Sequence, residues 1–111
     1  MKKVKLNVSE RLYAVRILNQ FKGSLDKLSV ILEDIKQFPM TDKEWETAER
    51  VISGEGETTT WKWNDEKGGL KEIEIQSETA RYIVDDIEKK DKAGELTLED
   101  RTAIDLLKKI R

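Results

Sequence analysis

Apolar and polar residues alternate at the start of the chain. Within residues 3–8, apolar side chains occupy every second position: Val4, Leu6 and Val8. A period of two residues is typical of a strand that buries one face. Ser9 can cap a helix, and apolar residues at helical spacing then run to Phe21. The pattern predicts a strand followed by a helix over residues 10–21 that is buried on several sides.

The next helical segment, residues 25–38, has a very regular spacing. Its apolar positions lie three and four residues apart: Leu25, Leu28, Ile31, Leu32, Ile35 and Phe38. Charged residues, Asp34 among them, lie between these positions and are expected to face solvent. Ser24 can cap the helix, and Pro39 ends it because proline disfavours helical geometry in the residue before it.

A third helix is predicted after the proline. Thr41 and Glu44 have the spacing of a capping box. The buried stripe of this helix is expected to hold four residues: Trp45, Ala48, Val51 and Ile52. The Gly- and Glu-rich residues 53–57 then predict a flexible connector between two halves of the chain.

Residues 58–75 have the pattern of a β-hairpin. The first strand is rich in Thr and Trp, two glycines close the turn, and the second strand alternates again. Trp61 and Trp63 share one face of the first strand, and Lys62 lies on the other. We expect Lys62 to pair across the strands with a glutamate.

Two helices are predicted in the last third of the chain. Ser77 caps the first, whose buried stripe has four members: Ala80, Ile83, Val84 and Ile87. Gly94 ends this segment, and Thr97 with Asp100 forms another capping-box pattern. The last helix is expected to bury five apolar residues: Leu98, Ala103, Ile104, Leu107 and Ile110.

The two halves of the chain have similar patterns. A shift of 69 residues aligns Val4 with Ile73, Leu6 with Ile75, Tyr13 with Tyr82, Val15 with Val84 and Leu18 with Ile87. A shift of 56 residues aligns Thr41 with Thr97, and so the third helix with the last. This favours an internal duplication of a strand-helix-helix unit, although any two such units share apolar positions. The first half would be residues 1–52, with residues 25–38 as an inserted helix, and the second residues 58–111.

Together these elements predict a single α+β domain over residues 1–111. A small antiparallel sheet, made of the N-terminal strand and the β-hairpin, would pack with about five helices. The junction between two similar halves is a natural crevice for a ligand.

Charge narrows the range of partners. Charged residues make up 40% of the chain, but 21 basic and 23 acidic residues nearly cancel and are interspersed. A nucleic-acid-binding surface would need a basic surplus, and no apolar run approaches the roughly 18 residues of a membrane span. We therefore expect a cytoplasmic protein without a membrane partner, and nucleic acid is disfavoured.

Candidate catalytic chemistry is sparse. The chain contains neither Cys nor His, which excludes disulfides and thiolate metal sites and removes the commonest general base. Residues 53–57 are rich in glycine, but their glutamates would repel a phosphate, so they do not form a phosphate-binding loop. Some carboxylates could act as acid and base or hold a cation, but they lie on predicted solvent faces: Asp34, Asp42, Glu44, Asp85 and Asp86. We expect no catalytic residue, no metal and no cofactor, and predict that the protein is not an enzyme.

Trp61 and Trp63 are the candidate binding residues. Trp is enriched at binding hot spots, so an exposed one could be a stacking platform or an anchor for a protein partner. With Lys62 or Arg81 nearby, it could hold a nucleotide by stacking and charge. The alternative is that both tryptophans cover the helices as part of the core.

Several segments together resemble a known group of proteins. They are LNVSERL at residues 6–12, WKWN at 61–64, EKG at 66–68, KEIEI at 71–75 and ELTLE at 95–99. Their order resembles a family of small uncharacterised proteins encoded in bacteriophages and prophages of Gram-positive bacteria. The resemblance spans nearly the whole chain except residues 25–39, and its motifs are structural rather than catalytic.

The resemblance implies a non-enzymatic phage accessory protein that acts by binding in the host-cell cytoplasm. Counter-defence is the expected role. The protein would mask a host defence protein or sequester a small nucleotide signal, in a crevice between its halves or between subunits of a homo-oligomer. The alternatives are a phage structural or assembly component and a weak nucleic-acid-binding regulator.

Overall fold

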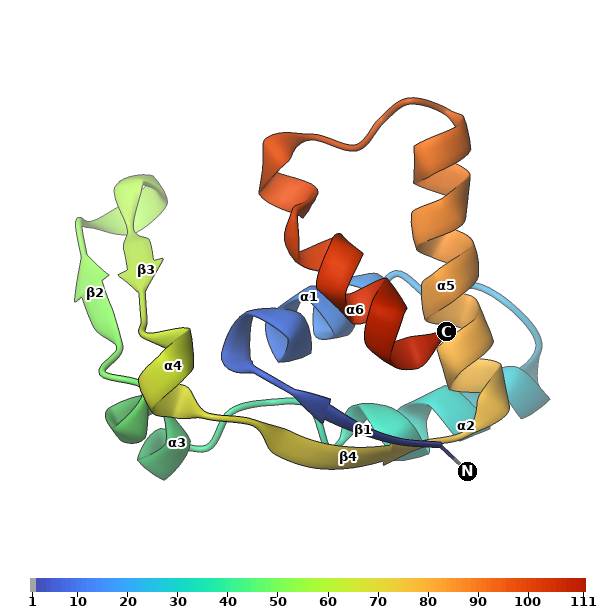
Figure 1. Cartoon of the computed structure of the whole chain (residues 1–111), viewed down its shortest axis with the longest axis horizontal. Helices are drawn as coiled ribbons and strands as arrows, with labels where there is room; N and C mark the ends of the chain where they lie inside the picture. Colours follow the sequence, from blue (N-terminus) through green and yellow to red (C-terminus); the bar gives the residue numbers. More distant parts are fainter. Residues whose placement is uncertain (1) are drawn as a thin grey trace.

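The computed structural model describes residues 2–111 and shows an α+β fold, as the sequence predicts. Within this range, six α-helices and two antiparallel strand pairs follow one another (Figure 1). In chain order the elements are β1 (Lys2–Leu6), α1 (Val8–Leu18), α2 (Leu25–Ile35), α3 (Asp42–Thr47), β2 (Val51–Ser53), η1 (Gly56–Thr58), β3 (Thr60–Lys62), α4 (Asp65–Gly68), β4 (Lys71–Ile75), α5 (Ser77–Lys92), η2 (Leu98–Asp100) and α6 (Thr102–Ile110).

β1 and β4 form the strand pair that carries the main core. They run antiparallel with Val4 opposite Ile73 at the centre of the register, and both bury every second residue. Their buried side chains belong to one apolar cluster with residues of α1, α2, α5 and α6. The alternation that predicted each strand thus reflects one buried face on a two-stranded sheet.

The predicted hairpin over residues 58–75 is wrong. β3 pairs instead with β2, and β4 pairs with β1. Between β3 and β4 lies the short helix α4, capped by the side chain of Asn64. Lys62 consequently lies opposite Val51 rather than a glutamate. Burial explains the pairing, because β1 offers β4 a partner whose apolar residues continue the main core.

Residues 53–57, predicted to connect two halves, form the tip of the β2–β3 hairpin instead. Gly54 has a φ of +90°, and a Cβ at this position would lie 2.3 Å from the carbonyl oxygen of Thr58. Only glycine fits such a turn. The glycines of this segment therefore mark a tight reversal and not a boundary.

Most of the predicted helix ends are confirmed. The caps that form as expected are Ser24 for α2, Thr41 with Glu44 for α3, and Thr97 with Asp100 for η2, which leads into α6. Gly94 ends the α5 segment with a φ of +69°. α1 differs, because Asn7 rather than Ser9 is its cap. The Asn7 side chain accepts the backbone N–H of Glu10 at 2.8 Å, so the helix begins two residues earlier than predicted.

Asp34 is buried, contrary to the expectation that it faces solvent. α5 begins at Ser77 without a side-chain cap from its own sequence. Asp34 of α2 takes this role, since its carboxylate accepts the Gln76 backbone N–H at 2.9 Å and the Thr79 hydroxyl at 2.6 Å. The prediction that Ser77 caps this helix is therefore wrong.

Several residues predicted to be buried are exposed. They are Leu25, Leu28 and Leu32 of α2, Val51 and Ile52 of β2, Leu98 of η2 and Ile104 of α6. α2 buries the side that holds Ile31 and Asp34, and its apolar stripe is wider than the side its neighbours cover. Trp45 is buried, as predicted.

The structure contains two similar β-α-α units, β1-α1-α2 and β4-α5-α6 (Figure 1). At a shift of 69 residues the two strands match, and α1 and α5 begin at equivalent positions. Over residues 31–39 of the first unit and 103–111 of the second, buried, half-buried and exposed side chains follow in the same order, position by position. α2 packs against α5 and α6 packs against α1, so each unit's second helix covers the other unit's first helix.

This arrangement makes α2 the counterpart of α6. The predicted alignment of the third helix with the last is corrected accordingly, and α2 is not the insertion. The segment without a counterpart is residues 40–70, which holds α3, β2, η1, β3 and α4 and is called the inserted lobe below. It has a small apolar cluster of its own with α1, centred on Val8, Trp45 and Ala48.

Candidate functional site

The inserted lobe holds the three tryptophans of the chain in one cluster. Trp61 and Trp63 each meet Trp45 edge-on, with ring centroids 5.8 Å apart in both pairs. The Arg50 guanidinium lies 5.1 Å from the ring centres of both Trp45 and Trp61. This contact fixes the Trp61 ring in place while 48% of the residue stays exposed.

Trp63 joins the inserted lobe to α1. Its indole N–H donates to Asp65 Oδ1 at 3.0 Å and lies 3.2 Å from Ser9 Oγ. The Ser9 hydroxyl in turn donates to Asp65 Oδ2 at 2.6 Å. Gly68 permits the close approach of α4, because a Cβ there would lie 2.7 Å from the Val8 side chain. Trp63 is half-buried, so part of its ring surface stays accessible. Its indole N–H is not free to bind a ligand, because it already donates to Asp65.

A second segment faces the tryptophans across a gap. It comprises residues 94–101, called the strap below, and Asp100 anchors it. Asp100 Oδ1 accepts the Tyr13 hydroxyl at 2.8 Å and lies 3.4 Å from Arg16 Nη2, while Oδ2 accepts the Thr97 backbone N–H at 2.9 Å.

The same contacts shift two pKa values. Burial and the hydrogen bond to Asp100 raise the pKa of Tyr13 to about 12. The Thr97 backbone N–H, followed by the Tyr13 hydroxyl, lowers the pKa of Asp100. Tyr13 therefore stays a neutral donor and Asp100 a charged acceptor, and the strap is held against α1.

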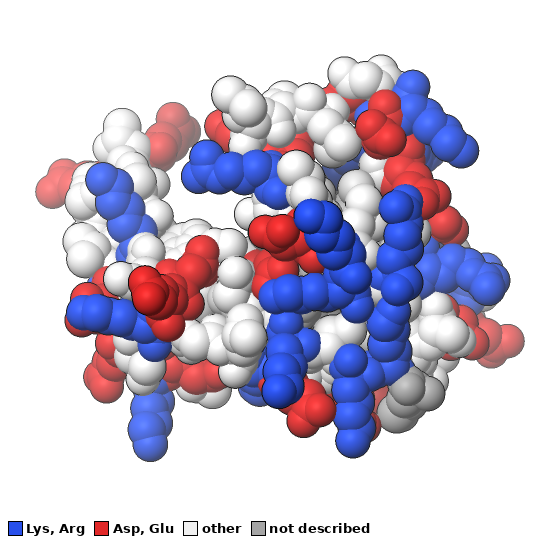
Figure 2. All heavy atoms as spheres, in the orientation of Figure 1, with Lys and Arg blue, Asp and Glu red and all other residues white. Residues whose placement is uncertain are grey.

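Between the inserted lobe and the strap lies a groove of about 840 Å³, called the tryptophan groove below. Figure 2 shows an open notch between these two parts on this face of the molecule. Its lining combines apolar surface with two cations and one anion: Trp61, Trp63, Leu12 and Leu98, with Arg16, Arg101 and Glu99. Arg16 is paired with Asp100, whereas Arg101 makes no ion pair within residues 2–111.

The structure brings only part of the predicted site together. Trp61 of β3 and Trp63, which follows that strand, both line the tryptophan groove. Lys62 is exposed but does not line the groove, and Arg81 lies on α5 in a different pocket. The cations of the groove come from α1 and the strap, which are distant from β3 in the sequence. Sequence reasoning missed them because no local pattern connects these segments.

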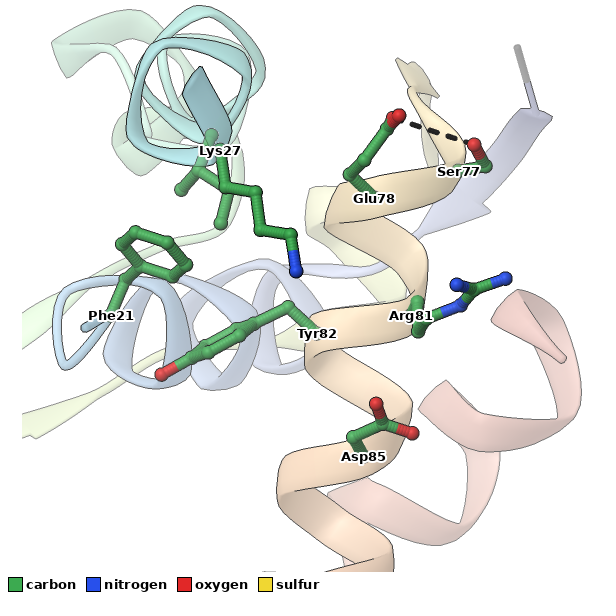
Figure 3. Close-up of a pocket in the computed structure, with 8 residues that line it drawn as sticks. Phe21, Lys27, Ser77, Glu78, Arg81, Tyr82 and Asp85 are labelled. Carbon is green, nitrogen blue, oxygen red and sulfur yellow. Dashed lines mark hydrogen bonds between the residues drawn. The ribbon is translucent and has the colours of Figure 1, made fainter. Parts of the chain in front are cut away.

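A second pocket of about 340 Å³ lies between α2 and α5 (Figure 3). Phe21 and Tyr82 form its aromatic wall, with ring centroids 5.0 Å apart at 64°. Lys27 projects toward this wall, whereas the Asp85 carboxylate extends to the side of α5 that also carries Arg81. Burial, followed by the charge of Asp86, raises the pKa of Tyr82.

The carboxylates considered as catalytic or metal-binding candidates are scattered. Asp34 caps α5, Glu44 binds Arg11, and Asp86 pairs with Lys90. Asp42 lies in the first turn of α3, and Asp85 lines the second pocket. Across residues 2–111 no group of three or more acidic side chains is placed to hold a metal ion. In the same part of the chain, no helix has the length and apolar character needed to span a bilayer.

Arg11 is the most extensively bonded buried cation of the first unit. Its guanidinium donates to the Phe38 carbonyl at 2.9 Å, the Pro39 carbonyl at 2.8 Å and the Glu44 carboxylate at 2.9 Å. The hydrogen bond to Arg11 is the main reason that the pKa of Glu44 falls to about 2. These contacts tie the start of the inserted lobe to α1.

No protein-family model, curated protein or solved structure matches this chain.

Proposed function

We propose that this protein acts by binding rather than by catalysis, and that the tryptophan groove holds a nucleotide ligand. One observation carries the proposal: the half-exposed indole of Trp61 shares an open groove with Arg16 and Arg101. An aromatic platform beside two guanidinium groups suits a ligand that combines a planar base with phosphate.

Each part of such a ligand has a matching group. A base stacked on an aromatic side chain gains about 1–3 kcal/mol. Guanidinium groups match the geometry of phosphate oxygens and can bind them in a bidentate manner. Because Arg50 already holds the Trp61 ring, little side-chain freedom is lost when a base stacks on it.

The biological role follows from the resemblance noted in the sequence. We propose a phage accessory protein that sequesters a nucleotide signal in the host cell and so counters a defence system. With a net charge of −2, the chain lacks the field that steers nucleic acid to a surface. Local contacts in the tryptophan groove must then supply the affinity.

A different observation favours a second candidate function, the masking of a host protein. The leucines Leu25, Leu28 and Leu32 are exposed along one side of α2, and Leu25 is 77% exposed. Exposed apolar stripes of this kind are common at protein contacts. This surface belongs to α2 and not to the tryptophan groove, so the two candidate functions can be tested separately.

The test is titration calorimetry with the dinucleotide adenylyl-adenosine. Trp61→Ala should weaken binding at least about tenfold, because the stacking surface is lost. Lys62→Ala is the matched control on the same strand and should bind as the wild type does. Equal affinity of Trp61→Ala and wild type, or no binding by the wild type, would contradict the proposal.

A further inference from the structure

The pocket between α2 and α5 occupies the position in the second unit that the tryptophan groove occupies in the first. Tyr82 and Asp85 of the pocket correspond, at a shift of 69, to Tyr13 and Arg16 of the groove. Lys27 corresponds, at the shift of 72 that aligns α2 with α6, to Glu99. Both cavities thus lie between the first helix of one unit and the second-helix segment of the other.

The two cavities share a chemical plan with its charges exchanged. Each is lined by a tyrosine and a charged side chain of the first helix, and by a side chain of opposite charge from the second-helix segment of the other unit. In the groove the cation, Arg16, is on the first helix, whereas in the pocket the first helix supplies Asp85 and α2 supplies the cation, Lys27. The inserted lobe walls only the groove, which explains the smaller volume of the pocket.

The charged groups of the pocket are available to a ligand. Lys27 and Asp85 both line the pocket, and their side chains make no ion pair with any residue in the described range, 2–111. Figure 3 shows the Lys27 amine directed over the Tyr82 side of the pocket. Glu78, which also lines it, is directed away from Tyr82 and lies 3.4 Å from the Ser77 hydroxyl.

We propose that this pocket is a second nucleotide site, suited to a single nucleoside monophosphate. The base packs against Tyr82 and Phe21, and the phosphate binds the Lys27 amine. A volume of about 340 Å³ falls at the small end of the range of roughly 300–1,000 Å³ for small-molecule sites. The ligand class rests on the proposed function, whereas the charges and the cavity are independent of it.

Nuclear magnetic resonance can separate the two sites in one titration. With AMP as the probe, the backbone amides around Tyr82 and Asp85 report the pocket, and the indole N–H of Trp61 reports the groove. Lys27→Glu should weaken the α5 response about tenfold or more and leave the indole response unchanged. Trp61→Ala should leave the α5 response intact. Lys43→Glu, an exposed charge reversal on α3, is the control and should change neither.

The outcomes distinguish the two proposals. An indole response without an α5 response would overturn the second site and leave the groove standing. An α5 response that Lys27→Glu does not weaken would also overturn it, because the phosphate contact would be absent. A third check uses adenosine, which should bind the pocket about tenfold more weakly than AMP; equal binding would contradict the role of Lys27. If AMP and adenylyl-adenosine produce no response anywhere, both proposals fail.

Discussion

The β1-α1-α2 unit and the β4-α5-α6 unit bury equivalent positions but hold their helices with different polar groups. α1 is capped within its own sequence by Asn7, and its buried Arg11 binds the segment that leads into the inserted lobe. α5 lacks a cap of its own and takes the carboxylate of Asp34 from α2. At the position of Arg11 the second unit has Ala80, and no lobe is attached there. The apolar pattern thus builds a common framework, and polar contacts make the two units different.

This comparison places the candidate functions where the units diverge. The tryptophan groove needs the inserted lobe, which only the first unit has. The pocket between α2 and α5 lies at the equivalent position of the second unit, where no lobe is attached. Arg11, Asp34 and Glu44 test how far the units depend on their polar contacts, and Leu25 tests the exposed side of α2.

The largest effect is expected for Arg11→Ala. Removal of this guanidinium leaves the Phe38 and Pro39 carbonyls without their partner and Glu44 without its cation. Because Arg11 is buried while the Glu44 side chain is 30% exposed, the loss of these hydrogen bonds should cost about 3 kcal/mol of unfolding free energy. Urea denaturation measures it, with exposed Arg81→Ala as the control expected within about 0.5 kcal/mol of wild type. A loss below about 1 kcal/mol would show that the inserted lobe does not depend on this contact.

Asp34→Ala should have the next largest effect. It removes the cap of α5 and leaves the Thr79 hydroxyl buried without a partner, at a cost of about 2 kcal/mol. Asp34→Asn keeps an acceptor and should lose less. Glu33→Ala, its exposed neighbour, serves as the control in the same denaturation series. If Asp34→Ala and Glu33→Ala are equally stable, the cap across the two units has no energetic role.

Asp34 also shows how far the sequence could predict the fold. Periodicity predicted the strands at both β1 and β4 and every α-helix except the short α4, because each buried face leaves a regular apolar pattern. It could not show that β4 pairs with β1, because strand pairing between distant segments depends on which core they share. Periodicity also assigned Asp34 to the solvent side, since a buried carboxylate is favourable only when partners from another helix reach it.

The candidate site, like the fold, could be predicted from the sequence only in part. That Trp61 and Trp63 lie on the same side was predictable from their spacing of two residues, although β3 ends at Lys62. The cations beside them were not, because Arg16 and Arg101 reach the tryptophan groove from other elements. The cations that the sequence suggests, Lys62 and Arg81, do not line that groove.

Lowering the pH should weaken the attachment of the inserted lobe to α1, because protonation of Glu44 removes its charge beside Arg11. Its folded pKa of about 2 lies below the ordinary value of 4.5, so its contribution is present above pH 4.5 and is lost as the pH falls toward 2. Glu44→Gln should lack this part of the pH dependence. Denaturation between pH 7 and pH 2 measures it, and Glu46→Gln on the same helix should follow the wild-type curve. Parallel curves for Glu44→Gln and wild type would contradict the assignment.

The smallest effect is expected on the outer side of α2. Leu25→Ser should change the unfolding free energy by less than about 0.5 kcal/mol, because Leu25 is exposed. Ile31→Ala on the inner side of the same helix should cost about 2–5 kcal/mol. A large loss for Leu25→Ser in the isolated protein would show that the leucine stripe is covered, as in a homo-oligomer.

Native mass spectrometry of the protein purified from phage-infected and uninfected Gram-positive cells tests the central claim most directly. Wild-type protein should retain a small ligand with the mass of a nucleotide, and Trp61→Ala should have lost most of it while staying folded. A wild-type protein that is free of ligand from both sources, or a Trp61→Ala variant that retains the same ligand in full, would contradict binding in the tryptophan groove.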